Sequence, residues 1–260
     1  VFNFIGGNSL VYSPDSQSIA YAALDGETWK IIVNHVTAFS YENADILQLA
    51  FTPKEQKIAA ILETIDGVHL EVDGKAQDTF EKIDHLVLNP GNDQSAYIAE
   101  KDDDKHLVLD GNVIVSADNV RQPVFSPEGN SFAFAYRNGS EWFVRKGDEE
   151  YGPYDNAAQL TFSPDGKKLA FTVERGEDYF VVVDGNDQTF YDGVGQPIWS
   201  PDSKRLAYAA RRIHKKFLQA IDTYFVVVDG EEKKVYSAIG ESGLTFSSDS
   251  QRFAYKAQLK

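Results

Sequence analysis

Polar side chains recur at one position of this sequence, each 37 residues after the one before. The position is held by Gln48, His85, Gln122, Gln159 and Gln196. Glutamine carries two hydrogen-bond donors and an acceptor, so four glutamines and a histidine would make a neutral hydrogen-bonding ring if they lay together. Such a ring suits a peptide, a sugar or ordered water. The alternative is that each glutamine caps backbone groups of its own connection, and the sequence leaves both interpretations open.

A basic segment is the second candidate for binding. Residues 211–216 read RRIHKK and lie in a repeat that is ten residues longer than its neighbours. The positions concerned are Arg211, Arg212, His214, Lys215 and Lys216. Fixed positive charges would steer a partner, and the acidic segment 100–106, EKDDDKH, would add a lobe of opposite sign that suits a polar protein partner. The alternative is a solvated loop that only balances nearby acidic residues.

Motifs of known catalytic machines are missing from the sequence. It has no G-x-S-x-G elbow, H-E-x-x-H pair, Walker A loop, Rossmann glycine fingerprint or EF-hand loop. His69 and His106 occupy matching positions 37 residues apart, where other repeats carry an aromatic residue such as Phe180, so we interpret them as packing residues. Only His85 and His214 then stay near a functional face, fewer than a metal-dependent enzyme would need. We therefore predict no metal site and no cofactor, and we favour binding over catalysis.

The elements that would position these residues follow from an internal repeat. A ten-residue signature, clearest in FSPDGKKLAF (162–171) and WSPDSKRLAY (199–208), occurs seven times. It is anchored at Pro14, Pro53, Pro90, Pro127, Pro164, Pro201 and, in the last copy, Ser248. Each copy predicts a β-hairpin, because proline presets φ and Asp and Gly accept a tight turn between short strands. A second hairpin lies between signatures, as in 179–194 and 224–239, so each repeat supplies four strands, named a, b, c and d.

Four short strands every 37 residues predict a β-propeller, because one such sheet cannot bury both its faces alone. We predict an all-β fold: a single domain over 1–260, closed, built of four-stranded antiparallel blades. Seven blades is the preferred number and six is the alternative. The residue two positions before each anchor proline should lie between neighbouring blades, with its side chain buried there. The members of this column are Tyr12, Phe51, Leu88, Phe125, Phe162, Trp199 and Phe246.

The two ends of the chain align with each other. VFNFIGGNSLVYSP (1–14) matches VYSAIGESGLTFSS (235–248) without a gap. We therefore interpret the first residues as a d strand that joins the last blade and closes the ring, which would remove an exposed sheet edge. A seventh c strand is missing from the sequence, so the closing blade is either three-stranded or completed by residues beyond it.

The signature W/F-S-P-D-G/S-K-x-L-A-Y/F resembles the repeats of TolB-like, WD-repeat-like propellers. The resemblance covers essentially the whole chain, but the residues that recur shape turns and packing. Relatives of this architecture serve as protein-interaction platforms, as gating domains of prolyl oligopeptidases and, in a few cases, as lyases. The resemblance therefore implies a propeller without naming its ligand.

Composition narrows the classes of partner. A formal net charge of −15 repels nucleic acid and anionic lipid headgroups over most of the surface. No uninterrupted apolar run approaches the roughly 18 residues of a membrane span, so we predict no membrane insertion. The absence of cysteine removes the usual clue to the compartment, and a periplasmic or extracellular location is favoured over a cytoplasmic one.

Three functional hypotheses follow from these observations. The leading one is a non-enzymatic module or scaffold that binds a protein or peptide through the face formed by the d–a and b–c connections, with an oligosaccharide as another ligand class. The second is a carbohydrate-active or metal-dependent lyase or hydrolase with its site at the channel mouth around His85. The third is a structural module of a larger periplasmic or extracellular assembly.

Overall fold

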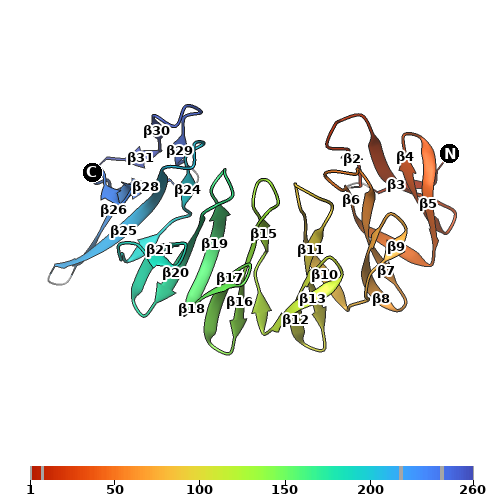
Figure 1. The fold of residues 1–260 in the computed structure, drawn as a ribbon, viewed down its shortest axis with the longest axis horizontal. Coiled ribbons are helices and arrows are strands. Elements are labelled where there is room, and N and C mark those ends of the chain that lie inside the picture. Colours follow the sequence, from red (N-terminus) through yellow and green to blue (C-terminus); the bar gives the residue numbers. More distant parts are fainter. Residues whose placement is uncertain (1, 7–8, 217–218, 241–242, 260) are drawn as a thin grey trace. The chain divides into compact units, whose positions relative to one another are not determined.

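A computed structural model describes residues 2–6, 9–216, 219–240 and 243–259. Every regular element among them is a β-strand, and none of these residues belongs to a helix. Contacts divide the chain into two compact units, Val1–Gln122 and Pro123–Lys260. Each unit is a series of antiparallel sheets whose strands follow one another in chain order (Figure 1). The predicted all-β architecture with four-stranded antiparallel sheets is therefore confirmed.

The described residues of the first unit form three sheets. The first has the order β1-β3-β4-β5 with β2 also beside β3, the second β6-β7-β8-β9 and the third β10-β11-β12-β13. The strands are β1 (Phe4–Ile5), β2 (Val11–Tyr12), β3 (Ile19–Asp25), β4 (Thr28–Val33), β5 (Val36–Glu42), β6 (Ala44–Phe51), β7 (Ile58–Thr64), β8 (Gly67–Val72), β9 (Lys75–Ala76), β10 (Lys82–Leu88), β11 (Ser95–Lys101), β12 (Asp104–Leu109), β13 (Asn112–Ala117) and β14 (Asn119–Val120).

The second unit continues the pattern. Its first sheet holds β15, β16, β17 and β18, the next has the order β19-β20-β21-β22, and in the third β23 and β24 both pair with β25, followed by β26 and β27. In the last repeat β28 pairs with β31 and β29 with β30. The strands are β15 (Val124–Phe125), β16 (Phe132–Asn138), β17 (Glu141–Lys146), β18 (Glu149–Tyr154), β19 (Asn156–Phe162), β20 (Leu169–Arg175), β21 (Asp178–Val183), β22 (Asn186–Asp187), β23 (Gly193–Val194), β24 (Ile198–Trp199), β25 (Leu206–Lys216), β26 (Gln219–Val228), β27 (Glu231–Glu232), β28 (Ala238–Ile239), β29 (Thr245–Phe246), β30 (Phe253–Ala254) and β31 (Ala257–Gln258).

Every copy of the signature forms the predicted a–b hairpin. The paired strands are β2–β3, β6–β7, β10–β11, β15–β16, β19–β20, β24–β25 and β29–β30. In the fifth copy the hydroxyl of Ser163 donates to Oδ1 of Asp165 at 2.6 Å and accepts the backbone N–H of Lys168 at 3.0 Å. Gly166 lies in the same turn at φ +70°, a conformation that glycine adopts without strain. Local turn chemistry therefore fixes each hairpin.

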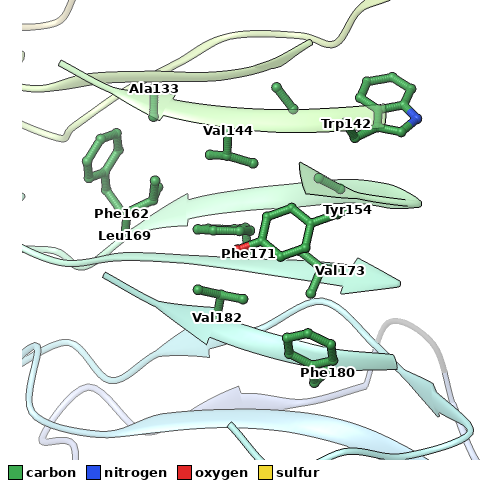
Figure 2. Close-up of a cluster of buried hydrophobic side chains, with 12 residues drawn as sticks. Ala133, Trp142, Val144, Tyr154, Phe162, Leu169, Phe171, Val173, Phe180 and Val182 are labelled. Atoms are coloured by element: carbon green, nitrogen blue, oxygen red, sulfur yellow. The ribbon is translucent and has the colours of Figure 1, made fainter. Parts of the chain in front are cut away.

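The core lies between successive sheets. Val144 of β17 packs in one cluster with Phe162 of β19, Phe171 of β20 and Phe180 of β21, and Figure 2 shows these side chains filling the space between neighbouring sheets. In the first unit Phe51 packs in the same way with Ile31 of the preceding sheet. Phe51 and Phe162 are each 8% exposed, so for these two the prediction of burial between sheets is confirmed.

Tyr12 departs from this column. It is 65% exposed, although it occupies the position of Phe51 and Phe162. It belongs to the first sheet of the series, where no preceding sheet of the first unit covers it. Tyr12 therefore lies on an uncovered sheet face, whereas the matching faces at Phe51 and Phe162 are covered by a preceding sheet.

Strand a is interrupted in the middle, and this overturns the placement of the N-terminal segment. Phe4 pairs with Leu24 and Val11 with Ala20, so β1 and β2 are two halves of the first strand a. The prediction that this segment is a d strand of the last blade is therefore wrong. The alignment with 235–248 holds, but strand d lies earlier: Tyr236 bridges to Tyr224, and the residues after it, β28, already pair with strand b. The same break recurs as register shifts in β6, β10 and β19.

Hydrogen bonds join the a–b turns of consecutive repeats. The backbone N–H of Asp165 donates to Ser203 Oγ at 2.9 Å, and that of Asp202 donates to Ser250 Oγ at 2.9 Å. In the first unit the carboxylate of Asp93 accepts the N–H of Lys54 at 3.0 Å. A backbone donor that points towards the next sheet is thus satisfied by that sheet's own turn.

We expect Ser203→Ala to lower the free energy of unfolding by about 1 kcal/mol, because the N–H of Asp165 loses its acceptor. Chemical denaturation of the whole chain measures the change. Ser140→Ala, in the exposed turn between β16 and β17, is the control and should have little effect. Equal stability of the two variants would contradict a stabilising role for the bond between turns.

Candidate functional site

The Gln/His column lies at the interruption of strand a. His85 falls between Asp84 and Val87, where the register of β10 shifts, and Gln159 falls at the matching shift of β19. Both adopt left-handed backbone conformations, with φ of 55°. A β-bulge leaves its extra residue unpaired and turns its side chain out of the ladder. His85 and Gln159 therefore occupy the bulge itself, whereas Gln48 follows the bulge of β6 and pairs with Ile61.

All five side chains of the column are exposed. Gln48, His85 and Gln122 belong to the first unit, and Gln159 and Gln196 to the second. Gln159 accepts a hydrogen bond from the hydroxyl of Thr172 at 3.3 Å, a contact with its own strand b. For the other four, the described part of the chain shows no side-chain hydrogen bond, so their polar groups face solvent. A ring made by all five stays a prediction.

Two members of the column share a hollow in the second unit with a residue of the basic segment. Gln159, Gln196 and Arg211 line this hollow, which has a volume of about 580 Å³. Its other walls include Tyr224 and the apolar side chains of Ile239 and Leu244. We call it the glutamine hollow. It brings together, within one unit, three residues that the sequence had nominated separately.

Arg211 is held along one wall of the glutamine hollow. It pairs with Gly193, and a Cβ at Gly193 would lie 3.4 Å from the arginine Nε, so glycine leaves room for the side chain. Its Nη2 donates to the backbone oxygen of Asp192 at 3.0 Å. Guanidinium has five N–H donors, so this anchor leaves others to meet a ligand. Arg211 is also the only charged residue among the described residues that line the hollow.

The basic segment is part of a β-ribbon and not the loop that we predicted. β25 continues to Lys216, with Ile213 opposite Asp222 and His214 opposite Ile221 in β26. Ten residues of β25 pair in register with β26, so the two strands form a continuous antiparallel ribbon. Successive side chains along the ribbon point to opposite sides of it. The side chains of Lys215 and Lys216 lie outside the described part of the chain. Steering of a partner by this segment stays a prediction.

Arg212 serves the fold of the second unit. Its guanidinium pairs with Glu232 at 2.7 Å and lies over the rings of Tyr191 and Phe225, 5.0 and 5.2 Å from their centroids. The hydrogen bond from the guanidinium to Glu232 raises the pKa of Arg212. His214 Nε2 is 3.1 Å from the hydroxyl of Thr223. Of the nominated basic residues, Arg211 is therefore the one whose described contacts place it at a hollow.

The remaining histidines bear on the metal and packing interpretations. His106 lies 2.8 Å from the hydroxyl of Ser116 through Nδ1, and its ring centroid is 6.1 Å from that of Phe80. This environment agrees with a packing role. Among the described residues there is no group of three or more His, Cys, Asp and Glu that could hold a metal ion.

The described residues also include no helix with the length and apolar character needed to cross a membrane.

Comparisons with known proteins add a general likeness to solved β-propellers. No family model matches the sequence, and no curated protein does. The Dos1 propeller matches over 97% of this chain and 75% of its own, at 11% identity and a TM-score of 0.49. Hsv2 of Kluyvelomyces marxianus matches over 97% and 98%, at 13% and 0.42, and the propeller domain of the trilobed protease of Pyrococcus furiosus over 69% and 65%, at 17% and 0.43. At this level of similarity we draw no conclusion about family or function.

We expect Arg212→Ala to destabilise the chain by on the order of 1 kcal/mol, because it removes both the ion pair and the contact with two rings. Thermal or chemical unfolding measures the loss. Glu232→Gln is the matched control: it removes the charge pair and keeps the ring contacts, so it should cost less. A larger effect of Glu232→Gln would show that the pair, and not the rings, holds Arg212.

Proposed function

We propose that this chain is a non-enzymatic binding module or scaffold for a protein or peptide partner, and that the glutamine hollow is one of its contact sites. The observation that carries the proposal is the meeting of Gln159, Gln196 and Arg211 at one hollow. They come from strand a of one repeat, strand a of the next and strand b beside it. Strands a and b of neighbouring repeats therefore supply all three residues.

The chemistry of the glutamine hollow suits a peptide. Amide side chains can donate to and accept from a peptide backbone, and Arg211 can bind a carboxylate through two N–H groups. The apolar walls offer a place for one side chain of the ligand. With one positive charge in its lining, the hollow favours a peptide that ends in a carboxylate or carries an acidic residue.

The peptide proposal predicts different effects on two sets of synthetic peptides, one with a free C-terminal carboxylate and one amidated. Arg211→Gln should weaken binding of the free acids about tenfold and leave the amides unchanged, because only the former offer a carboxylate. Gln196→Ala should weaken both sets. Isothermal calorimetry or fluorescence anisotropy measures the affinities.

Lys167→Gln is the control for this experiment, because it removes the same charge at an a–b turn, where the side chain is 80% exposed. Unchanged affinity of the Arg211→Gln variant for the free acids would remove Arg211 from the site. Binding of neutral oligosaccharides but of neither peptide set would replace the peptide by a sugar.

For the whole chain we propose a single domain, 1–260, that forms a closed TolB-like propeller of seven blades. The proposal is supported by seven a–b hairpins and by the 65% exposure of Tyr12, whose counterparts Phe51 and Phe162 are buried against a preceding sheet. In a closed ring the last repeat would supply that cover. The sequence signature that resembles TolB-like repeats is the reason for naming this kind of propeller.

If the propeller is closed, Tyr12→Ser should lower the free energy of unfolding by about 2 kcal/mol, because a buried aromatic side chain would be lost. In a chain without closure the same substitution affects an exposed side chain and should change stability by less than about 0.5 kcal/mol. Denaturant titration separates the two results. Val36→Ser, at another exposed apolar side chain, gives the background for such a substitution.

A further inference from the structure

A second hollow lies in the first unit, at the end of the sheets where strands b and c connect. It has a volume of about 810 Å³ and lies between the turn at Gly26–Glu27, the connection at Asn43–Asp45 and the turn at Glu63–Ile65. Trp29 forms part of its wall. Gly26, at φ +66°, leaves the rim open, because a Cβ there would meet no atom within 4 Å. We call this site the acidic hollow.

Like charges face each other at the acidic hollow. Asp45 of β6 is directly opposite Glu63 of β7 in the register, and like charges at such a position destabilise a sheet. The matching pair of the third sheet is Lys82 opposite Glu100, which are of opposite sign and lie 3.9 Å apart. Glu27 adds a third carboxylate, and the described residues that line the hollow include no lysine or arginine. The second sheet thus keeps a repulsion that a bound cation would relieve.

Trp29 presents a fixed aromatic surface beside these carboxylates. Its indole N–H donates to Oδ1 of Asp45 at 2.9 Å. On the other side the ring of Phe4 meets it edge to face, with centroids 6.1 Å apart. Trp29 is only partly buried. An aromatic ring held in this way can take the alkyl part or the charged end of a lysine or arginine side chain.

Ile65 projects an apolar side chain at the rim. It is 94% exposed. In four other repeats the matching b–c turns carry Gly26–Glu27, Asp102–Asp103, Gly139–Ser140 and Gly176–Glu177, so Ile65 sets the second repeat apart from these four, whereas the sequence of the sixth repeat has Phe217–Leu218 at the corresponding place. The turn is braced by the hydroxyl of Thr64, which donates to the backbone oxygen of Gly67 at 3.1 Å and accepts the N–H of Asp66 at 3.3 Å. Ile65 is therefore presented to solvent by an ordered turn.

We propose that the acidic hollow docks a basic segment of a partner protein, in which an apolar side chain packs on Ile65 and Trp29 while lysine or arginine side chains meet Glu27, Asp45 and Glu63. Charge complementarity selects the partner: three carboxylates without a basic residue among the described lining residues favour a positively charged segment. The exposed isoleucine requires an apolar group next to that charge. This site is separate from the glutamine hollow and does not rest on the function proposed for it.

The test uses a synthetic peptide rich in lysine and leucine, titrated into the whole chain at low and at high salt. Ile65→Ser should weaken binding at least about tenfold without changing stability, because the side chain is exposed. Glu63→Lys should weaken binding as much and remove most of its salt dependence. It should not destabilise the chain, since it recreates the lysine–acid pair seen at Lys82 and Glu100. Loss of binding in a variant that stays stable assigns the effect to the surface.

Two control variants leave the acidic hollow intact. Val36→Ser changes an exposed apolar residue at the start of β5, and Asp148→Lys reverses an exposed charge in the c–d turn between β17 and β18. Both should bind the peptide like the unchanged chain. Equal affinity of the Ile65→Ser or Glu63→Lys variant would overturn the proposal, as would no binding at about 1 mM peptide or a preference for neutral oligosaccharides. Self-association of the chain that Ile65→Ser abolishes would also overturn it, by assigning the hollow to a second copy.

Discussion

The apolar character of both faces of each sheet is the constraint on which this structure depends. In β20, residues Leu169 to Val173 are all buried: Leu169 and Phe171 face the preceding sheet, and Ala170 belongs to the cluster shared with the following one. A sheet of this kind is stable only between two others, since each uncovered face would expose several large side chains to water. The faces are therefore committed to packing. Binding groups can be placed only at turns, connections and irregularities of the strands.

The bulge in strand a is the irregularity that this fold uses. Before the bulge, strand a pairs with the C-terminal half of strand b, and after the bulge it pairs with the N-terminal half. In β10 this change takes place around His85. The residue at the bulge is exposed without any cost to the packed faces. The bulge holds His85 in β10 and Gln159 in β19, and in β6 it lies directly before Gln48. A column of glutamines is then a property of the repeat, and its use by a ligand depends on what each repeat adds nearby, such as Arg211 beside Gln196.

The hairpins could be predicted from the sequence because their signals are local. Proline, serine and aspartate shape the a–b turn through contacts within a few residues, as between Ser163 and Asp165. The bulge could not be predicted in the same way, because its position depends on the pairing between strands. The alignment of 1–14 with 235–248 favours a d strand around Phe4, whereas its pairing with β3 makes it part of strand a. The extra length of the sixth repeat favours a loop at 211–216, whereas the structure pairs this segment with β26.

The acidic hollow was missed at the sequence level because its members are ordinary residues when taken singly. Asp45 and Glu63 become notable only through their register, and Ile65 only through its place at the tip of a turn. In the other described strand pairs, charged residues that face each other are of opposite sign, as at Arg145 and Glu150, and the matching b–c turns of four other repeats are polar or glycine at the tip.

Exposure alone does not identify a binding site, and the contrast between Tyr12 and Ile65 shows why. Tyr12 lies on a sheet face whose counterparts are covered by another sheet, so a neighbouring blade is sufficient to explain an aromatic residue there. Ile65 lies at the tip of the turn between β7 and β8 and is 94% exposed. Packing of one sheet face on the next therefore does not explain an apolar residue at this position. Its matching positions are polar or glycine in the first, third, fourth and fifth repeats. An apolar residue that packing within the repeat cannot explain, next to an acid pair that the register does not favour, is the pattern expected where surface chemistry serves a partner and not the fold.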